Sequence, residues 1–275
     1  MPLVVTPNGP LHYDIIDLVT PWRVDRPTIL FHHGIGGSVG MWSGWLPHLI
    51  DRYRIVTWDM RGYGRSAATG FEWSLDLLVA DVFSVANAVG IEQFHLAGES
   101  IGGTVALAAA IAHPDRISTL TVSNGAHLGA SLQRVQAWRK QLDEGGSKGW
   151  SDAFMHDRFY DQSLSSGRWA WFAEQQAKWP RDSILSALGV LVGTDLSDRL
   201  SAIRCPTLLL HPDASPFIPV SIVAELHRLM PGSQLHVFGN ARHGLPFSHD
   251  RQCAELLRRF LDSSEAGRGS SIARD

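Results

Sequence analysis

The sequence predicts an α/β protein in which a mostly parallel, doubly wound sheet is interrupted by a helical insertion. Three observations lead to this prediction. Short apolar runs alternate with helical segments along the first 126 residues. A serine lies between glycines at the point where one apolar run meets a helix of small residues. From residue 127 to 200 the apolar runs stop, and they return at residue 206.

The first predicted strands are short and apolar. They cover residues 10–17, 28–33 and 54–59. Apolar residues then recur at helical spacing from Leu75 to Val89, which predicts an amphipathic helix with one buried face. The helix is expected to end at Gly90, since glycine is the preferred residue just beyond a helix C-terminus.

A strand, a sharp turn and a helix are predicted next. Residues 94–97 form the strand, and the small residues 104–110 form the helix. The segment His113-Pro114-Asp115-Arg116 ends that helix. Residues 117–123 form a further apolar run, which suits a strand buried on both faces.

The pattern changes between residues 127 and 200, which are polar, helical in pattern and rich in tryptophan. Strands return at 206–211 and 234–238, and a last helix covers 254–261. We therefore expect one α/β core, a lid inserted into it and a disordered Ser/Gly-rich tail. These parts are the core at 1–126 and 201–262, the helical lid at 127–200, and the tail at 263–275.

Composition excludes several function classes. The net charge of −3 gives no reason to expect nucleic acid or an anionic membrane as a partner. No apolar run reaches the ~20 residues that span a bilayer, and the N-terminus lacks signal-peptide features. The only two cysteines, Cys205 and Cys253, have no metal-site spacing, so we expect free thiols, no metal and a cytoplasmic location. Composition says nothing about the oligomeric state.

Ser100 is the candidate nucleophile. It lies in Gly98-Glu99-Ser100-Ile101-Gly102, between a predicted strand and a predicted helix, which fits the G-x-S-x-G nucleophile elbow. The flanking glycines avoid steric clashes in the tight turn and leave Oγ exposed at a helix N-terminus. Glu99 is expected to point away from Oγ and either to have a structural role or to support the residues that react.

A serine hydroxyl needs a base within hydrogen-bond reach. His243 is the best candidate, because Gly239-Asn240-Ala241-Arg242-His243-Gly244 directly follows the last predicted strand. Open α/β sheets place ligand chemistry at the carboxyl ends of their strands.

The oxyanion of an acyl-transfer reaction needs two backbone donors. The Ile101 amide, directly after the nucleophile, is the first candidate. The loop His33-Gly34-Ile35-Gly36-Gly37 provides the second, with the Ile35 amide as the expected donor. A histidine before this loop can hold it by hydrogen bonds.

These motifs occur in the order seen in α/β-hydrolase-fold enzymes, together with a turn at residues 59–66 that we take as structural. The chain resembles that superfamily outside the lid and tail. Within it, the chain is most similar to the 3-oxoadipate enol-lactonase and meta-cleavage-product hydrolase group. The resemblance implies an α/β-hydrolase fold with a helical lid.

The third member of the triad departs from the family pattern. In the family a strand ends in a glycine, two further residues and the acid, usually followed by proline. Here residues 211–219 place Ser215 at the acid position. Asp213, two residues earlier, is expected to orient His243 through a reshaped loop. Two alternatives remain: an acid from elsewhere, or weak orientation by the Ser215 hydroxyl.

These residues predict a cofactor-free serine hydrolase that cleaves a carboxylic ester or an enol-lactone through an acyl-enzyme. Carbon–carbon bond hydrolysis of a vinylogous diketone uses the same residues and is the first alternative. A ligand-binding, weakly hydrolytic sensor is the second. The partner is expected to be a small molecule, carboxylate-bearing or aromatic. Seven of the cations in the insertion are candidates to bind a carboxylate, and the sequence favours none: Arg134, Arg139, Lys140, Arg158, Arg168, Lys178 and Arg181.

Overall fold

An eight-stranded sheet forms the centre of the molecule in the computed structural model, which describes residues 2–23, 25–66 and 70–272. The strand order is β1-β2-β4-β3-β5-β6-β7-β8. β1 and β2 pair antiparallel at one edge, and the pairs from β4 to β8 are parallel, so the predicted sheet is confirmed. The strands are β1 (Leu3–Thr6), β2 (Gly9–Ile16), β3 (Thr28–His32), β4 (Arg54–Trp58), β5 (Phe94–Glu99), β6 (Ile117–Ser123), β7 (Thr207–Pro212) and β8 (Ser233–Phe238).

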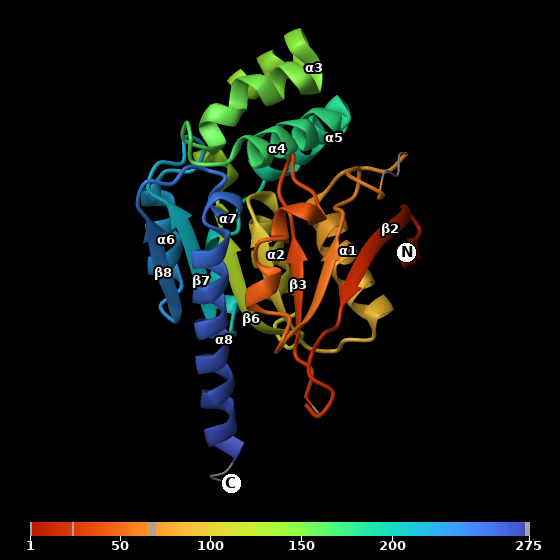
Figure 1. Ribbon diagram of the computed structural model, residues 1–275, viewed down its shortest axis with the longest axis vertical. Coiled ribbons are helices and arrows are strands. Elements are labelled where there is room, and N and C mark those ends of the chain that lie inside the picture. The colour runs from red at the N-terminus through yellow and green to blue at the C-terminus, as the bar shows by residue number, and fades with distance from the viewer. Residues whose placement is uncertain (1, 24, 67–69, 273–275) are drawn as a thin grey trace.

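Helices cover both faces of this sheet (Figure 1). Side chains alternate between the faces along each strand, so Leu30 packs into one core cluster and Phe31 into the other. The first cluster contains α1 (Leu75–Val89), α2 (Ile101–Ala112) and α6 (Val220–Leu229), and the second contains α8 (Asp250–Ile272). Gly90 ends α1 in the left-handed conformation, as predicted. Strand β1 and helix α6 were not predicted.

Three helices lie together beyond one end of the sheet (Figure 1). They are α3 (Val135–Arg158), α4 (Ser166–Lys178) and α5 (Arg181–Val192), and they enter the chain between β6 and β7. A single bridge between Leu128 and Asp195 joins the two ends of this insertion. Short 3-10 turns and the four-residue α7 complete the structure: η1 (Val39–Trp42), η2 (Leu46–His48), η3 (Gly129–Ser131), η4 (Ser197–Ala202) and α7 (Leu245–Ser248).

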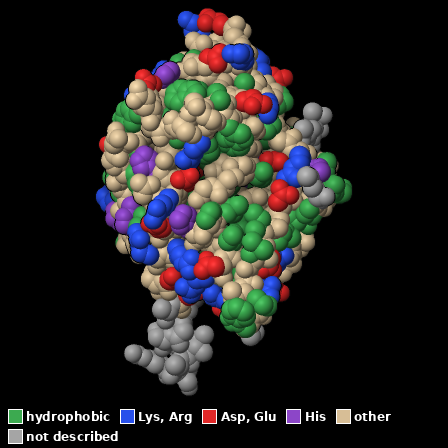
Figure 2. Space-filling view, in the orientation of Figure 1, with side chains coloured by type: hydrophobic (Ala, Val, Ile, Leu, Met, Phe, Trp, Pro, Cys, Tyr) green, Lys and Arg blue, Asp and Glu red, His purple; other side chains and the backbone are tan. Residues whose placement is uncertain are grey.

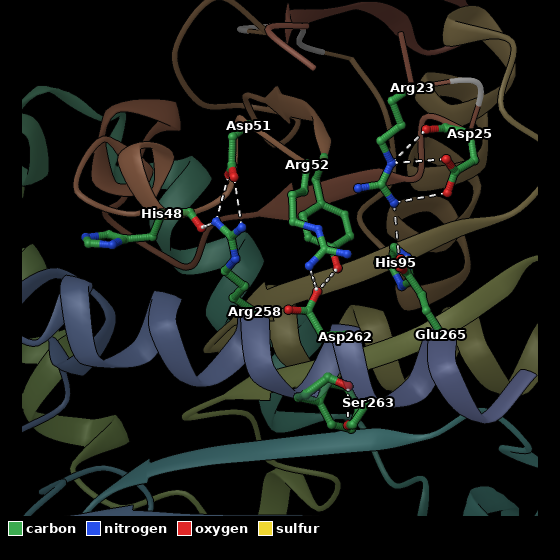
Figure 3. Close-up of polar contacts among 12 residues, drawn as sticks. Arg23, Asp25, His48, Asp51, Arg52, His95, Arg258, Asp262, Ser263 and Glu265 are labelled. Carbon is green, nitrogen blue, oxygen red and sulfur yellow. Dashed lines mark hydrogen bonds and ion pairs between the residues drawn. The ribbon is translucent and has the colours of Figure 1, made fainter. Parts of the chain in front are cut away.

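The expected disordered tail is corrected by the structure, in which α8 continues to Ile272. Side chains on its second half meet charged partners from the core (Figure 3). Asp262 pairs with Arg52 at 2.9 Å, and Glu265 lies 3.8 Å from Arg23 and 3.7 Å from the buried His95. These contacts join α8 to the core on both sides of residue 263, where composition alone predicted the start of a disordered tail. Residues 273–275 of the expected tail lie outside the described residues.

The distribution of charged side chains on the surface is consistent with the small net charge. On the face shown in Figure 2, acidic and basic side chains are interspersed. Among the described residues, every helix is too short or too polar to cross a bilayer.

Candidate active site

Ser100 lies at the corner between β5 and α2, with φ 55° and ψ −121°. A non-glycine residue with positive φ is strained and persists only where its surroundings hold it. Two glycines make the corner possible. A Cβ on Gly98 would lie 2.1 Å from the Gly102 carbonyl oxygen, and one on Gly102 would lie 2.4 Å from the His32 carbonyl oxygen. The Ser100 amide donates to the Ser123 carbonyl at 2.9 Å.

His243 meets Ser100 as the sequence predicted. Its Nε2 lies 3.3 Å from Ser100 Oγ, and its ring is buried in the loop after β8. The Asn124 side-chain amide donates to the His243 carbonyl, which fixes the backbone of this loop to the end of β6. Burial, the Arg158 guanidinium and His211 lower the pKa of His243 well below its usual value. The imidazole is therefore neutral at pH 7, the form that accepts a proton.

The structure corrects the role expected for Asp213. Its two carboxylate oxygens accept hydrogen bonds from the backbone amides of Asn240, at 2.9 Å, and Ala241, at 3.0 Å. The atom that faces His243 Nδ1 is instead Ser215 Oγ, at 3.1 Å. Asp213 holds the loop that carries His243 and does not orient the ring. The physical reason is local: the amides of Asn240 and Ala241 take both oxygens of this carboxylate.

The loop after β3 lies directly against the nucleophile. A Cβ on Gly34 would come within 2.7 Å of Ser100 Cβ. The Gly34 carbonyl accepts from His33 Nδ1 at 2.9 Å and from the Gly37 amide at 3.0 Å. The Met60 amide donates to His33 Nε2, so Nδ1 carries the ring proton. Because the C=O and N–H of one peptide point in opposite directions, these bonds also fix the direction of the Ile35 N–H.

Two residues of the insertion hold the same loop from the other side. Arg158, the last residue of α3, donates from Nη2 to the Ile35 carbonyl at 2.7 Å. Trp179, which follows α4, donates from Nε1 to the Gly36 carbonyl at 3.1 Å. Arg158 is buried, and its Nε donates to the Gln176 side chain. The insertion therefore shapes the loop as well as covering it.

Glu99 is closer to the reacting groups than the sequence indicated. Its carboxyl is buried, with Oε1 3.9 Å from His243 Nε2. Burial raises the pKa of Glu99 to about 7, while the Arg158 charge and a hydrogen bond from the Gly34 backbone oppose that shift. The position of Glu99 inside the sequence motif could have drawn attention to this residue. The motif alone does not indicate where the Glu99 side chain points.

A narrow apolar pocket opens onto Ser100 and His243. Its other lining residues are uncharged: Leu132, Gln133, Val135, Trp138, Leu188, Leu191, Phe217 and Ile218. Trp138 packs edge-on against Trp150 and Phe217. The lid tryptophans thus provide both a packed core and part of the pocket wall.

Six of the seven cations named in the sequence analysis lie in other contacts. Arg158 is bonded within the loop and Gln176 contacts described above, and five others form ion pairs: Arg134 with Asp157, Lys140 with Glu144, Arg168 with Asp250, Lys178 with Glu174, and Arg181 with Asp143 and Asp182. Within the described ranges, no group of three His, Cys, Asp or Glu side chains is placed to hold a metal ion.

Several known proteins are similar to this chain. The family model for the alpha/beta hydrolase fold matches residues 27–146. RutD of Klebsiella pneumoniae subsp. pneumoniae, named as a putative carbamate hydrolase, is 30% identical over 78% of this chain and 83% of its own. The pimeloyl-[acyl-carrier protein] methyl ester esterase of Aeromonas hydrophila is 30% identical over 86% of this chain and 95% of its own. The enol-lactonase of Burkholderia xenovorans LB400 superposes with a TM-score of 0.84 at 20% identity, covering 95% and 100% of the two chains.

Proposed function

This chain belongs to the α/β-hydrolase family, and from that premise we propose that it is a serine hydrolase that cleaves a carboxylic ester or an enol-lactone through an acyl-enzyme. The observation that supports this proposal most directly is the 3.3 Å contact between Ser100 Oγ and His243 Nε2 at a strained strand-to-helix corner. Relatives named as esterase and enol-lactonase agree with it.

In the proposed reaction, Ser100 Oγ forms a bond to the substrate carbonyl carbon and its proton passes to His243 Nε2. The Ile35 and Ile101 amides hold the oxyanion. The bond to the leaving oxygen then breaks, and His243 returns the proton to that oxygen. Water attacks the acyl-enzyme, His243 takes one water proton, and the proton returns to Ser100 Oγ as the carboxylic acid leaves.

The pocket supports a neutral, apolar acyl or alcohol group. None of its lining residues is a cation, and Arg134, Arg158 and Arg168 of the insertion are held by other partners. Each methylene buried there contributes about 0.8 kcal/mol, or about fourfold in kcat/KM. We expect p-nitrophenyl esters to improve from acetate to butyrate and to worsen for long acyl chains that exceed the pocket.

The test compares Ser100→Ala and His243→Ala with Ser84→Ala, a control on α1 whose hydroxyl bonds the Ala80 carbonyl. We expect the first two variants to lose at least about 10³ in kcat with p-nitrophenyl butyrate, and the control to retain it. A serine-directed fluorophosphonate should label the unmodified protein and Ser84→Ala, should not label Ser100→Ala, and should label His243→Ala far more slowly because its serine lacks the base. Hydrolysis that persists in Ser100→Ala would refute the proposal.

One observation favours a second candidate, a ligand-binding protein with little turnover. His243 Nδ1 faces a hydroxyl of Ser215 where an ionised acid would stabilise the imidazolium better. A single slow turnover with a large thermal shift on ligand binding would favour this candidate. Multiple turnovers at ordinary rates would exclude it. Assays on vinylogous diketones would separate ester from carbon–carbon bond hydrolysis.

A further inference from the structure

The proposed reaction places a positive charge on His243 in a buried site. When Nε2 takes the Ser100 proton, the ring becomes an imidazolium that is 2% exposed. A buried charge without a partner of opposite sign is costly. On the Nδ1 side, Ser215 offers only a hydroxyl, which also accepts hydrogen bonds from the Phe217 and Ile218 amides. That side supplies a dipole but no charge.

The other side of the ring has a carboxyl. Glu99 is the last residue of β5, and its buried Oε1 lies 3.9 Å from His243 Nε2. An opposite charge within about 4–6 Å favours the ionised form of a group. The backbone fixes this carboxyl in place, since a Cβ on Gly34 would lie 2.1 Å from Glu99 Oε2.

We propose that Glu99 is a positioning residue that supplies the negative charge for the His243 imidazolium, in place of the acid that Ser215 has replaced. This inference rests on the proposed serine-hydrolase function. It assigns to the residue before the nucleophile a role that the Nδ1 partner usually has, and it explains how turnover can proceed with a hydroxyl at position 215.

Three charged or titratable groups lie around this pair. Arg158 from α3 interacts with both Glu99 and His243, His211 from β7 faces His243, and Tyr63 faces Arg158. Before reaction, the Glu99 and Arg158 charges balance. During reaction the imidazolium and the substrate oxyanion add one charge of each sign. The site therefore stays neutral only if Glu99 is ionised.

The first experiment moves the charge from one side of the ring to the other. We would measure kcat/KM for p-nitrophenyl acetate in Glu99→Gln, Ser215→Asp and the double variant, with folding checked by thermal unfolding. Glu99→Gln should lose about 100-fold. The double variant should regain at least about tenfold of that loss, since the carboxylate introduced by Ser215→Asp reaches Nδ1. A purely structural Glu99 gives no such rescue.

The second experiment uses pH and does not require Glu99→Gln to fold. The pKa of Glu99 is raised to about 7, whereas the pKa of His243 is lowered. A change in activity near pH 7 therefore belongs to Glu99, because His243 is already neutral there. Activity of the unmodified protein should rise as pH rises through about 7, when Glu99 loses its proton.

Three outcomes would overturn the inference while leaving the serine-hydrolase proposal intact, provided that Ser100→Ala is inactive. One is a Glu99→Gln variant within about threefold of the unmodified protein. Another is a loss in Glu99→Gln that Ser215→Asp does not repair. The third is activity that rises as pH falls through about 7, which would show that protonated Glu99 is the active form. Full activity in Ser100→Ala would instead overturn the function itself.

Discussion

The two sides of the His243 ring are built in different ways. On the Nε2 side, Ser100 is held by backbone: a positive φ, two glycines without room for a Cβ, and an amide bonded to Ser123. On the Nδ1 side, the contact is a single side chain, Ser215, in a loop between β7 and α6. The nucleophile side follows the family motif and the acid side departs from it. A backbone packed this closely accepts few residue types at each position. A contact made by one side chain can instead be replaced by a different side chain.

The largest expected effect tests the backbone side. In Gly102→Ala the new Cβ would lie 2.4 Å from the His32 carbonyl oxygen, so the elbow must shift. We expect unfolding free energy to fall by at least about 3 kcal/mol, with loss of activity, as measured by urea unfolding. The control is Gly189→Ala in the exposed part of α5, where nothing lies within 4 Å. It should gain about 0.5–1 kcal/mol. Equal changes in unfolding free energy for the two variants would contradict the claim that the backbone around Ser100 is closely constrained.

A smaller effect tests the acid side. Asp213→Ala removes two hydrogen bonds to loop amides, which should cost about 2 kcal/mol of stability. Because Asp213 does not contact the ring, kcat at a temperature well below unfolding should fall by no more than about threefold. Parallel urea unfolding and kinetics on one preparation would check this. A loss of about 10⁴ in kcat, as expected for a triad acid, would show that Asp213 does orient His243.

The smallest expected effect tests whether the lid helps to hold the backbone on the Nε2 side of His243. Trp179→Phe keeps an aromatic ring near Tyr63 but loses the bond from Nε1 to the Gly36 carbonyl. One such bond is worth about 1 kcal/mol, so kcat should fall about fivefold with little change in KM. Trp22→Phe is the matched control, since Trp22 is 81% exposed. An unchanged kcat in Trp179→Phe would mean that the core alone fixes the loop after β3.

Sequence patterns predicted what the backbone dictates. The run from 117 to 123 became β6, and Gly90 ended α1, because periodicity and left-handed φ leave clear signals. The approach of His243 to Ser100 followed from both lying at the carboxyl ends of parallel strands.

The directions of individual side chains left no comparable signal in the sequence. Nothing in the pattern around Asp213 said that its oxygens would turn to the amides of residues 240 and 241. The approach of Glu99 to His243 depends on packing against Gly34, a residue distant in sequence. The contacts that α8 makes near residue 263 likewise depend on Arg23 and Arg52, which are distant in sequence.

The bonds from Arg158 and Trp179 to the loop after β3 also bear on how such proteins can be re-engineered. Exchanging lids between relatives is an obvious route to a new substrate range. In this molecule a grafted lid would also have to bring donors for the carbonyls of Ile35 and Gly36. A chimera that copied only the pocket walls would bind its new substrate and turn it over slowly.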